Sequence, residues 1–171
     1  IGIDSLAHKK TLDHGGVTLG VLGSGVNKTH IFPKENSRLG EDIIAQGGAL
    51  ISEYPPYTLP TVYSFPKRNR IIAGLSRGTL IIEAGEKSGA LITAQVALDL
   101  HRDVFAVQHN IFSPKGKGNN QLIAQGAHLT ESPEDIQEIL GLQTSHAYVT
   151  NTPIPHATKE EQTILGYLSK E

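Results

Sequence analysis

The chain has 171 residues, a formal net charge of -2 and no cysteine. This length can bury a sizeable core and suits one domain with an appendage, while the lack of cysteine excludes disulfides and thiolate metal sites. No apolar run is long enough to span a membrane and no signal-peptide pattern is visible, so we expect a cytoplasmic protein without a membrane partner. Because the first residue is Ile1 and not Met, we also expect that an N-terminal portion precedes it.

Positive charge is unevenly distributed along the chain. Residues 1–130 hold 13 Lys and Arg against 10 Asp and Glu, whereas residues 131–171 hold 2 against 7. No acidic residue lies between Glu53 and Glu83, and a second acid-free run extends from Asp103 to Glu131. Two local positive zones on a nearly neutral protein are sufficient to bind a polyanion.

The first part of the chain predicts a helix followed by a strand. Asp4 is placed to cap a helix that ends near His14, before two glycines. An apolar run at 17–22 predicts a strand. It stops at a turn of the kind that holds phosphates in doubly wound folds, formed by Gly23, Ser24 and Gly25. Because a dinucleotide fingerprint would need glycine where Lys28 stands, we discount NAD and FAD and expect no cofactor.

A second helix is predicted from about 37 to 46 and a short strand at 49–53. Residues 54–65 then combine Pro55, Pro56 and Pro60 with several aromatic residues, which predicts an irregular connection. Aromatic rings in such a loop can stack on nucleic-acid bases. Each Tyr could equally close over the edge of the core.

The segment after this connection carries the strongest functional signal. Pro66 suits the first turn of a helix, so we predict a helix over 66–75. Its first turn would hold Lys67, Arg68 and Arg70, although a helix N-terminus is already positive and normally attracts acids. Cations and free backbone N–H groups at one point predict a phosphate or nucleic-acid site. The alternative is a solvated basic turn.

The remaining segments continue the alternation. Strands are predicted at 79–83 and 104–107, and helices after Ser88-Gly89, at about 119–125 and after Ser132. This order predicts an α/β fold with a mainly parallel sheet covered by helices on both faces. Ligands of such sheets bind at the carboxyl ends of the strands. Three connections are expected at or near these strand ends: the turn at Gly23, Ser24 and Gly25, the basic stretch near Lys67, and the loop from Gly85 to Gly89.

The C-terminal segment has a different character. The apolar pattern lapses and Pro153 and Pro155 interrupt it, so residues 143–157 are predicted to be a linker. Residues 158–171 resemble a capped helix, the beginning of a second module. Residues 1–142 are therefore the expected main domain.

Several short motifs follow one another along the chain, at 2–4 with 7–8, 21–25, 52–55, 65–76, 83–84, 88–94 and 104–107. Together and in this order they resemble the DprA/Smf family of bacterial DNA-processing proteins. The resemblance implies an extended Rossmann-like domain, here without its N-terminal strand, and a C-terminal winged-helix-like module of which 158–171 would be the beginning. The family usually has Arg before its Gly-Ile-Asp motif, where this chain has Ile1.

The resemblance also implies a function. A family member would bind single-stranded DNA, form a homodimer and assist loading of the recombinase RecA during natural transformation. The roles in DNA binding that it implies fall on Gly23, Ser24, Gly25, Phe65, Lys67, Arg68, Asn69, Arg70, Ser88 and Gly89, with Phe65 as a base-stacking platform.

Catalysis is the alternative from another class of function. Related folds that hydrolyse N-glycosidic bonds of nucleotides carry a Gly-rich turn followed by Thr and Glu, which Gly78, Thr79 and Glu83 resemble in outline. The expected Pro-Gly-Gly opening is missing, however, and Glu83 has no evident acidic partner, so we expect no enzymatic activity. The eight histidines are scattered and none pairs at metal-ligand spacing, so we expect no metal site.

Overall fold

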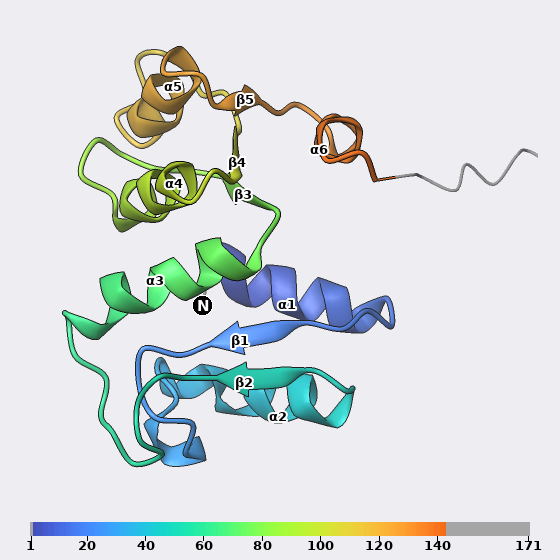
Figure 1. Ribbon diagram of the computed structural model, residues 1–171, viewed down its shortest axis with the longest axis vertical. Helices are drawn as coiled ribbons and strands as arrows, with labels where there is room; N and C mark the ends of the chain where they lie inside the picture. Colours follow the sequence, from blue (N-terminus) through green and yellow to red (C-terminus); the bar gives the residue numbers. More distant parts are fainter. Residues whose placement is uncertain (1, 143–171) are drawn as a thin grey trace, which may run out of the picture.

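Helices and strands alternate along the chain (Figure 1), and the structure, a computed structural model, describes residues 2–142. The helices are α1 (Ile3–Asp13), α2 (Ser37–Ala45), α3 (Ser64–Leu75), α4 (Gly89–Asp99), α5 (Lys117–Ala124) and α6 (Pro133–Ile139), with short 3-10 helices η1 (Lys28–His30) and η2 (Lys34–Asn36). The strands are β1 (Leu19–Val21), β2 (Ala49–Ile51), β3 (Gly78–Ile81), β4 (Asp103–Ala106) and β5 (His128–Leu129). The linker predicted at 143–157 and the module predicted at 158–171 lie outside the described residues.

Two helix starts differ from the sequence prediction. Helix α1 begins at Ile3 with Gly2 in the cap position, so Asp4 lies inside the first turn and is not the cap. Its carboxylate still stands at the positive end of the helix dipole. Helix α3 begins at Ser64, before Pro66, because Thr61 and Ser64 each donate a backbone N–H to the other's hydroxyl oxygen, at 3.0 and 3.2 Å. The predicted start of α6 is confirmed, and the Asp135 carboxylate accepts the Ser132 N–H at 2.8 Å.

All strand pairs are parallel, which confirms the predicted α/β class. The strands form two hydrogen-bonded groups, β1-β2 and β3-β4-β5. Leu19 pairs with Ala49 at the start of the first group, and Gly78 pairs with Asp103 at the start of the second. In Figure 1 the arrows of β1 and β2 point toward the side where α3 begins.

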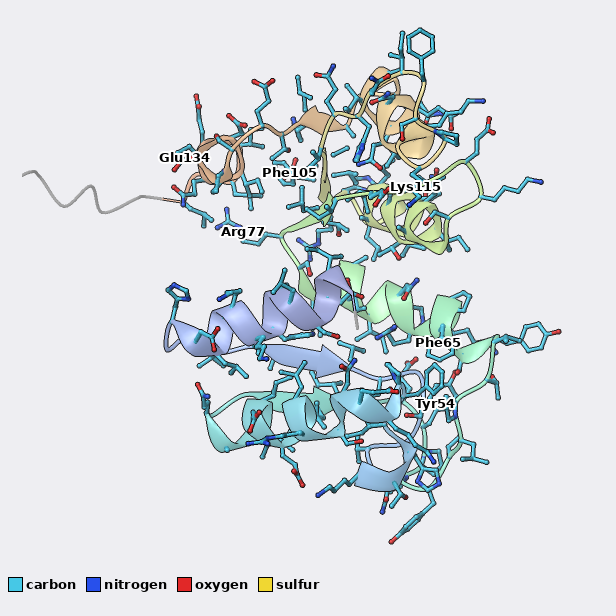
Figure 2. All side chains as sticks on the ribbon, turned by 180° about the vertical axis from the view of Figure 1, so that it is seen from behind. Tyr54, Phe65, Arg77, Phe105, Lys115 and Glu134 are labelled. Atoms are coloured by element: carbon cyan, nitrogen blue, oxygen red, sulfur yellow. The ribbon has the colours of Figure 1, made fainter. Side chains whose placement is uncertain are left out.

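Helices cover the strands from two sides. Helix α1 packs on α2, whereas α3 packs on α4, and α4 lies against both β3 and β4. Small side chains allow this close approach, since Ala73, Ala94 and Ala97 are fully buried where the helices meet the sheet. In β4, Val104 and Phe105 point to opposite faces and both are buried, which is typical of a parallel strand covered on both sides. Figure 2 shows Phe105 inside the part of the molecule that holds β3, β4 and β5.

One buried amide holds the ends of two strands together. The Asn119 side chain is fully buried at the start of α5. Its Nδ2 donates to the carbonyl oxygens of Ile81 and Val107 at 2.9 Å and to that of Ile82 at 3.1 Å. These carbonyls lie at the end of β3 or directly after β3 and β4, so Asn119 supplies donors at the point where the ladder between the strands ends.

Replacing Asn119 with Ala should therefore destabilise the protein. The Ile81 carbonyl keeps the Val107 N–H and the Ile82 carbonyl keeps the His109 ring, but the Val107 carbonyl loses its donor, which costs about 1–3 kcal/mol. Urea unfolding monitored by circular dichroism measures this loss. Gln121→Ala, at an exposed position of the same helix, is the matched control and should stay within about 0.5 kcal/mol of the unmodified protein. Equal stability of the two variants would contradict the role given to Asn119.

Candidate nucleic-acid interface

The segments that the sequence singled out gather on one side of the molecule. The turn after β1, the connection after β2 that leads into α3, and the loop after β3 that leads into α4 all follow carboxyl ends of strands. In Figure 1 the start of α3 and the loop before α4 lie on the side toward which β1 and β2 point. We call this side the carboxyl rim. Parallel sheets bind ligands at this position.

The glycine-rich turn is buried beneath the connection that follows β2. The Gly25 N–H donates to the Thr58 carbonyl at 2.9 Å, and the Ser24 carbonyl accepts the Ser52 hydroxyl at 2.6 Å. A Cβ atom on Gly25 would overlap the carbonyl oxygens of Pro55 and Pro56. The turn therefore positions the connection, and direct contact of Gly23, Ser24 and Gly25 with phosphates stays a prediction.

Two aromatic rings lie together at the start of α3. Phe65 is half-buried and rests against Gly23, where an added Cβ would lie 3.0 Å from its ring. The ring of Phe32 lies beside it, with 6.0 Å between the ring centroids, and is 62% exposed. Figure 2 shows Phe65 and Tyr54 in the same region of the molecule. Sequence reasoning missed Phe32, because nothing in its local pattern distinguishes an exposed ring from a buried one.

The three cations of α3 have different surroundings. Lys67 is exposed and makes no ion pair within residues 2–142. Arg70 forms an ion pair with Glu53, which lies just after β2 and before the connection that leads into α3. Arg68 turns inward, and its guanidinium donates to the Val21 carbonyl of β1. Only Lys67 is thus an uncompensated surface cation in this turn, which holds no acidic residue.

Arg68 belongs to a polar group between α1 and α3. Burial lowers the pKa of the Arg68 guanidinium, and the negative charge of Asp4 opposes this effect. Burial also lowers the pKa of His8, whose ring shares a 2.6 Å hydrogen bond with the Thr18 hydroxyl. Asp4 opposes the shift of His8, and the charge of Arg68 adds to it. Asn69 is half-buried beside this group.

The start of α4 provides further donors on the carboxyl rim. The Ser88 hydroxyl oxygen accepts the Ala90 N–H at 3.3 Å and so caps the helix. The first turn holds no acidic residue, and apart from the adjacent residues and the helix's own backbone nothing lies within 4 Å of the position that a Gly89 Cβ would occupy. The positive end of this helix therefore faces open space at Gly89.

The second positive zone, the acid-free run from Asp103 to Glu131, lies near the loop that leads into α4. Lys117 is paired with Glu86 at 2.8 Å, whereas Lys115 is exposed (Figure 2).

Glu83, the residue considered for catalysis, is exposed, and within residues 2–142 its carboxylate accepts no hydrogen bond. The described part of the chain also contains no cluster of three potential metal ligands and no helix long and apolar enough to cross a membrane.

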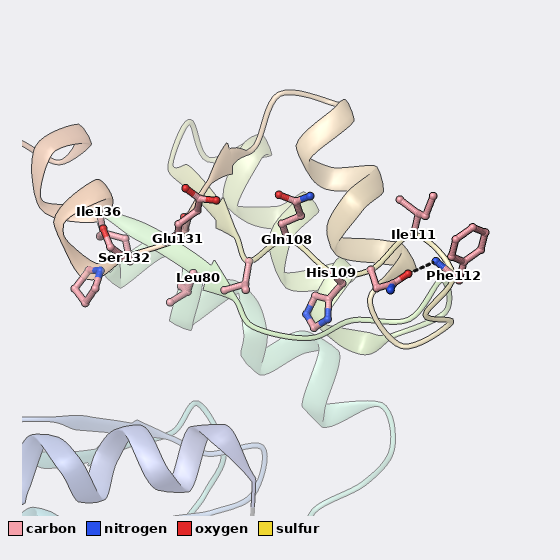
Figure 3. A pocket seen from close by; sticks show the side chains of 12 residues that line it. Leu80, Gln108, His109, Ile111, Phe112, Glu131, Ser132 and Ile136 are labelled. Atoms are coloured by element: carbon pink, nitrogen blue, oxygen red, sulfur yellow. Dashed lines mark hydrogen bonds between the residues drawn. The ribbon is translucent and has the colours of Figure 1, made fainter.

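A hollow of about 870 Å³, whose lining contains no Lys or Arg, lies beyond the ends of β4 and β5 (Figure 3). Its lining includes Leu80, His109 and Ile136, with Ile111 and Phe112 highly exposed at one end. The His109 ring is held by the Ile82 carbonyl at 2.8 Å. No residue of the predicted DNA site contributes to this hollow.

Comparison with known proteins places this geometry in a family. The family model described as DNA recombination-mediator protein A matches residues 1–141. The chain belongs to this family. Protein Smf of Escherichia coli is 48% identical over 139 residues, which cover 81% of this chain and 37% of that protein. DNA processing protein DprA of Bacillus subtilis is 46% identical over 139 residues, covering 81% and 46% of the two chains. This member of the family thus spans less than half the length of these curated relatives.

Solved structures agree with the family assignment. The X-ray structure of DprA from Streptococcus pneumoniae superposes with a TM-score of 0.72 at 41% identity, over 80% of this chain and 47% of that one. DprA from Helicobacter pylori, described for its single-stranded DNA binding mode, gives a TM-score of 0.62 at 22% identity, over 80% and 70%. These likenesses confirm the predicted Rossmann-like architecture and the resemblance to DprA/Smf proteins.

The different surroundings of Lys67 and Arg68 predict opposite effects on stability. Lys67→Ala removes a cation from a helix N-terminus, so stability should be unchanged or higher by about 0.3–1 kcal/mol. Arg68→Ala leaves the Val21 carbonyl without its donor and should lower stability by about 1–3 kcal/mol. Chemical denaturation of both variants checks this contrast. A stable Arg68→Ala variant would show that the contact with Val21 contributes little.

Proposed function

We propose that residues 1–142 form a DNA-binding domain that holds single-stranded DNA on the carboxyl rim, through backbone contacts with little sequence preference. The observation that carries the proposal is the first turn of α3, where exposed Lys67 stands at a positive helix end without any acidic neighbour in the turn. A phosphate group fits this position because both the charge and the helix dipole attract it.

Exposed aromatic rings favour a single strand over a duplex. Tyr57 and Tyr63 are 75% and 78% exposed in the connection that leads into α3, and Phe32 lies beside Phe65. Unpaired bases stack on such rings whatever their sequence, whereas bases inside a duplex are already stacked. Phosphates at Lys67 and bases on the rings would together hold a strand along the rim.

The other predicted contacts complete this site. Asn69, Arg70, Ser88 and Gly89 lie along the rim or beside it, and Arg70 would exchange its ion pair with Glu53 for a phosphate. The single-stranded DNA binding mode described for the H. pylori protein supports the choice of ligand. Gly23, Ser24 and Gly25 would act mainly by positioning the connection.

We also propose a homodimer that assists loading of RecA on the bound strand. Both statements rest on membership of the family. Analytical ultracentrifugation tests the first, and a monomer far above the DNA-binding concentration would refute it. RecA assembly on DNA coated with single-strand binding protein tests the second, with a rate unchanged by this chain as the contrary result.

Binding to oligonucleotides of different sequence tests the DNA site itself. Lys67→Ala should weaken binding to all single-stranded sequences alike and lower the slope of log K against log salt by about 0.7, the value for one lost phosphate contact. Fluorescence anisotropy between low and moderate salt measures both quantities.

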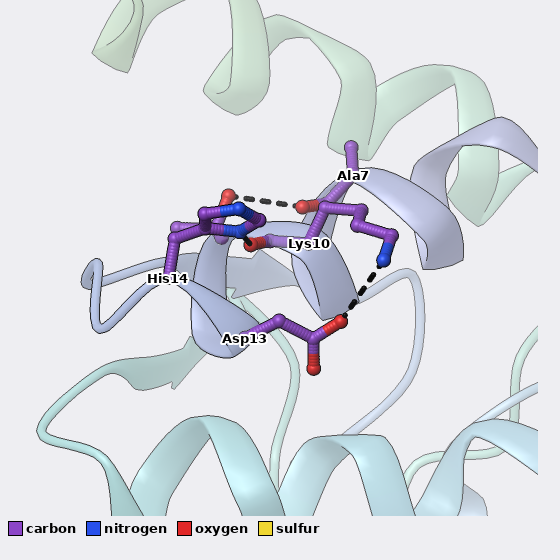
Figure 4. A network of polar contacts seen from close by, with 5 residues as sticks. Ala7, Lys10, Asp13 and His14 are labelled. Carbon is purple, nitrogen blue, oxygen red and sulfur yellow. Dashed lines mark hydrogen bonds and ion pairs between the residues drawn. The ribbon is translucent and has the colours of Figure 1, made fainter.

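Lys10→Ala is the matched control for this measurement. Lys10 lies in the last turn of α1, exposed and paired with Asp13 at 3.3 Å, in the network that includes the bond from the Thr11 hydroxyl to the Ala7 carbonyl (Figure 4). It should leave the slope unchanged. Equal slopes for Lys67→Ala and Lys10→Ala, or tighter binding to a sequence-matched duplex, would refute the proposed site.

A further inference from the structure

A long loop that follows β4 takes no part in the proposed DNA site. Residues 107–116 connect β4 to α5 and belong to the acid-free run between Asp103 and Glu131. Ile111 and Phe112, which we call the tip of this loop, are 76% and 87% exposed, and Phe112 is the most exposed large apolar side chain among residues 2–142. Figure 3 shows the tip at the end of the hollow far from Ile136. Side chains this exposed do not fill the hollow.

Hydrogen bonds hold the loop in one shape. The Asn110 side-chain oxygen accepts the Phe112 N–H at 2.9 Å (Figure 3), and the Asn110 carbonyl accepts the Ser113 N–H at 2.9 Å. Asn120 of α5 fixes the start of the loop, because its Oδ1 accepts the His109 N–H at 3.1 Å and its Nδ2 donates to the His109 carbonyl at 2.9 Å. An ordered turn thus presents the tip to solvent, and a ligand that binds there has little chain to order.

The loop lies beside the connection that leads into α4. A Cβ atom on Gly85 would lie 3.3 Å from the Pro114 carbonyl oxygen, and the Gly118 N–H donates to the Ala84 carbonyl at 2.8 Å. The connection follows β3 and the loop follows β4, so both begin at the carboxyl ends of paired parallel strands. The loop therefore extends the carboxyl rim beyond the start of α4.

The charge of these two adjoining segments is positive. Lys115 in the loop and Lys87 in the connection are exposed, and neither makes an ion pair within residues 2–142. Lys117 and Glu86 compensate each other at 2.8 Å, which leaves Glu83 as the remaining acid of the two segments. An exposed aromatic ring among cations is the arrangement that binds single-stranded nucleic acid, through stacking and phosphate contacts.

We propose that Phe112 is a second stacking platform for the bound strand, and that Lys115 and Lys87 bind the phosphates next to the stacked base. The inference rests on the proposed function, because it continues the same strand along the carboxyl rim from the start of α3 past the start of α4. A ring stacks on any base, so this contact adds affinity and lengthens the site without adding sequence preference.

Affinity and salt dependence test the two kinds of contact separately. Phe112→Ala should weaken binding of an oligothymidylate of about 20 nucleotides by about tenfold, the effect of one lost stacking contact, and should leave the slope of log K against log salt unchanged. Lys115→Ala should lower that slope by about 0.7. Fluorescence anisotropy on the full chain measures both quantities. Since the side chain is 87% exposed, Phe112→Ala should melt like the unmodified protein.

Two further variants serve as controls. Phe112→Tyr keeps a ring at the tip and should retain the affinity. Leu100→Ala removes a 46% exposed apolar side chain just after the end of α4 that lies away from the rim, and it should bind like the unmodified protein. An equal loss of affinity in Phe112→Ala and Leu100→Ala would overturn the inference.

A photochemical crosslink locates the ring directly. An oligothymidylate that carries 5-iodouracil in place of thymine joins to stacked aromatic side chains on irradiation, and mass spectrometry should find Phe112 among the linked residues. Normal affinity of Phe112→Ala without a crosslink at Phe112 would overturn the inference, while a lower salt slope of Lys67→Ala would still support the proposed DNA site. No binding of the oligonucleotide by the unmodified protein would refute both. Binding to anionic lipid vesicles that depends on Phe112, with unchanged affinity for the oligonucleotide, would assign the tip to a lipid surface and overturn the inference alone.

Discussion

The parallel direction of the five strands determines where the other features lie. Because the strands are parallel within each hydrogen-bonded group, the connections that follow β2 and β3 begin at carboxyl ends of strands, and they lead into α3 and α4. Both helices therefore direct their positive dipole ends toward one rim. Neither helix carries an acidic residue in its first turn to offset this positive end.

Most of the fold could be predicted from the sequence, because buried parallel strands and covering helices leave apolar runs of characteristic length and period. The starts of α1 and α3 were less predictable. The reciprocal hydrogen bonds of Thr61 and Ser64 lie on the N-terminal side of the residues that show a helical period. The sequence pattern therefore indicated Pro66 as the first residue of α3. The division into two hydrogen-bonded groups could not be read from the apolar runs alone, since an apolar run does not reveal on which side it is paired.

The sequence singled out the segment proposed as the site, but not the surroundings of its side chains. Lys67 and Arg68 are neighbours in a helix, and their side chains leave it about 100° apart. Lys67 consequently reaches solvent, whereas Arg68 reaches the carbonyl of Val21, 47 residues away in the sequence. That long-range contact cannot be read from the local pattern. Phe32 was missed for a related reason, because its partner Phe65 lies on a different segment.

The aromatic connection beside α3 has a spectroscopic consequence. The chain contains no tryptophan and five tyrosines, of which Tyr54, Tyr57 and Tyr63 all belong to this connection. Its intrinsic ultraviolet emission therefore arises largely from the segment that borders the carboxyl rim. Stacking of a nucleobase on these rings would quench that emission, so an unlabelled protein carries its own optical reporter at the place where a strand would lie.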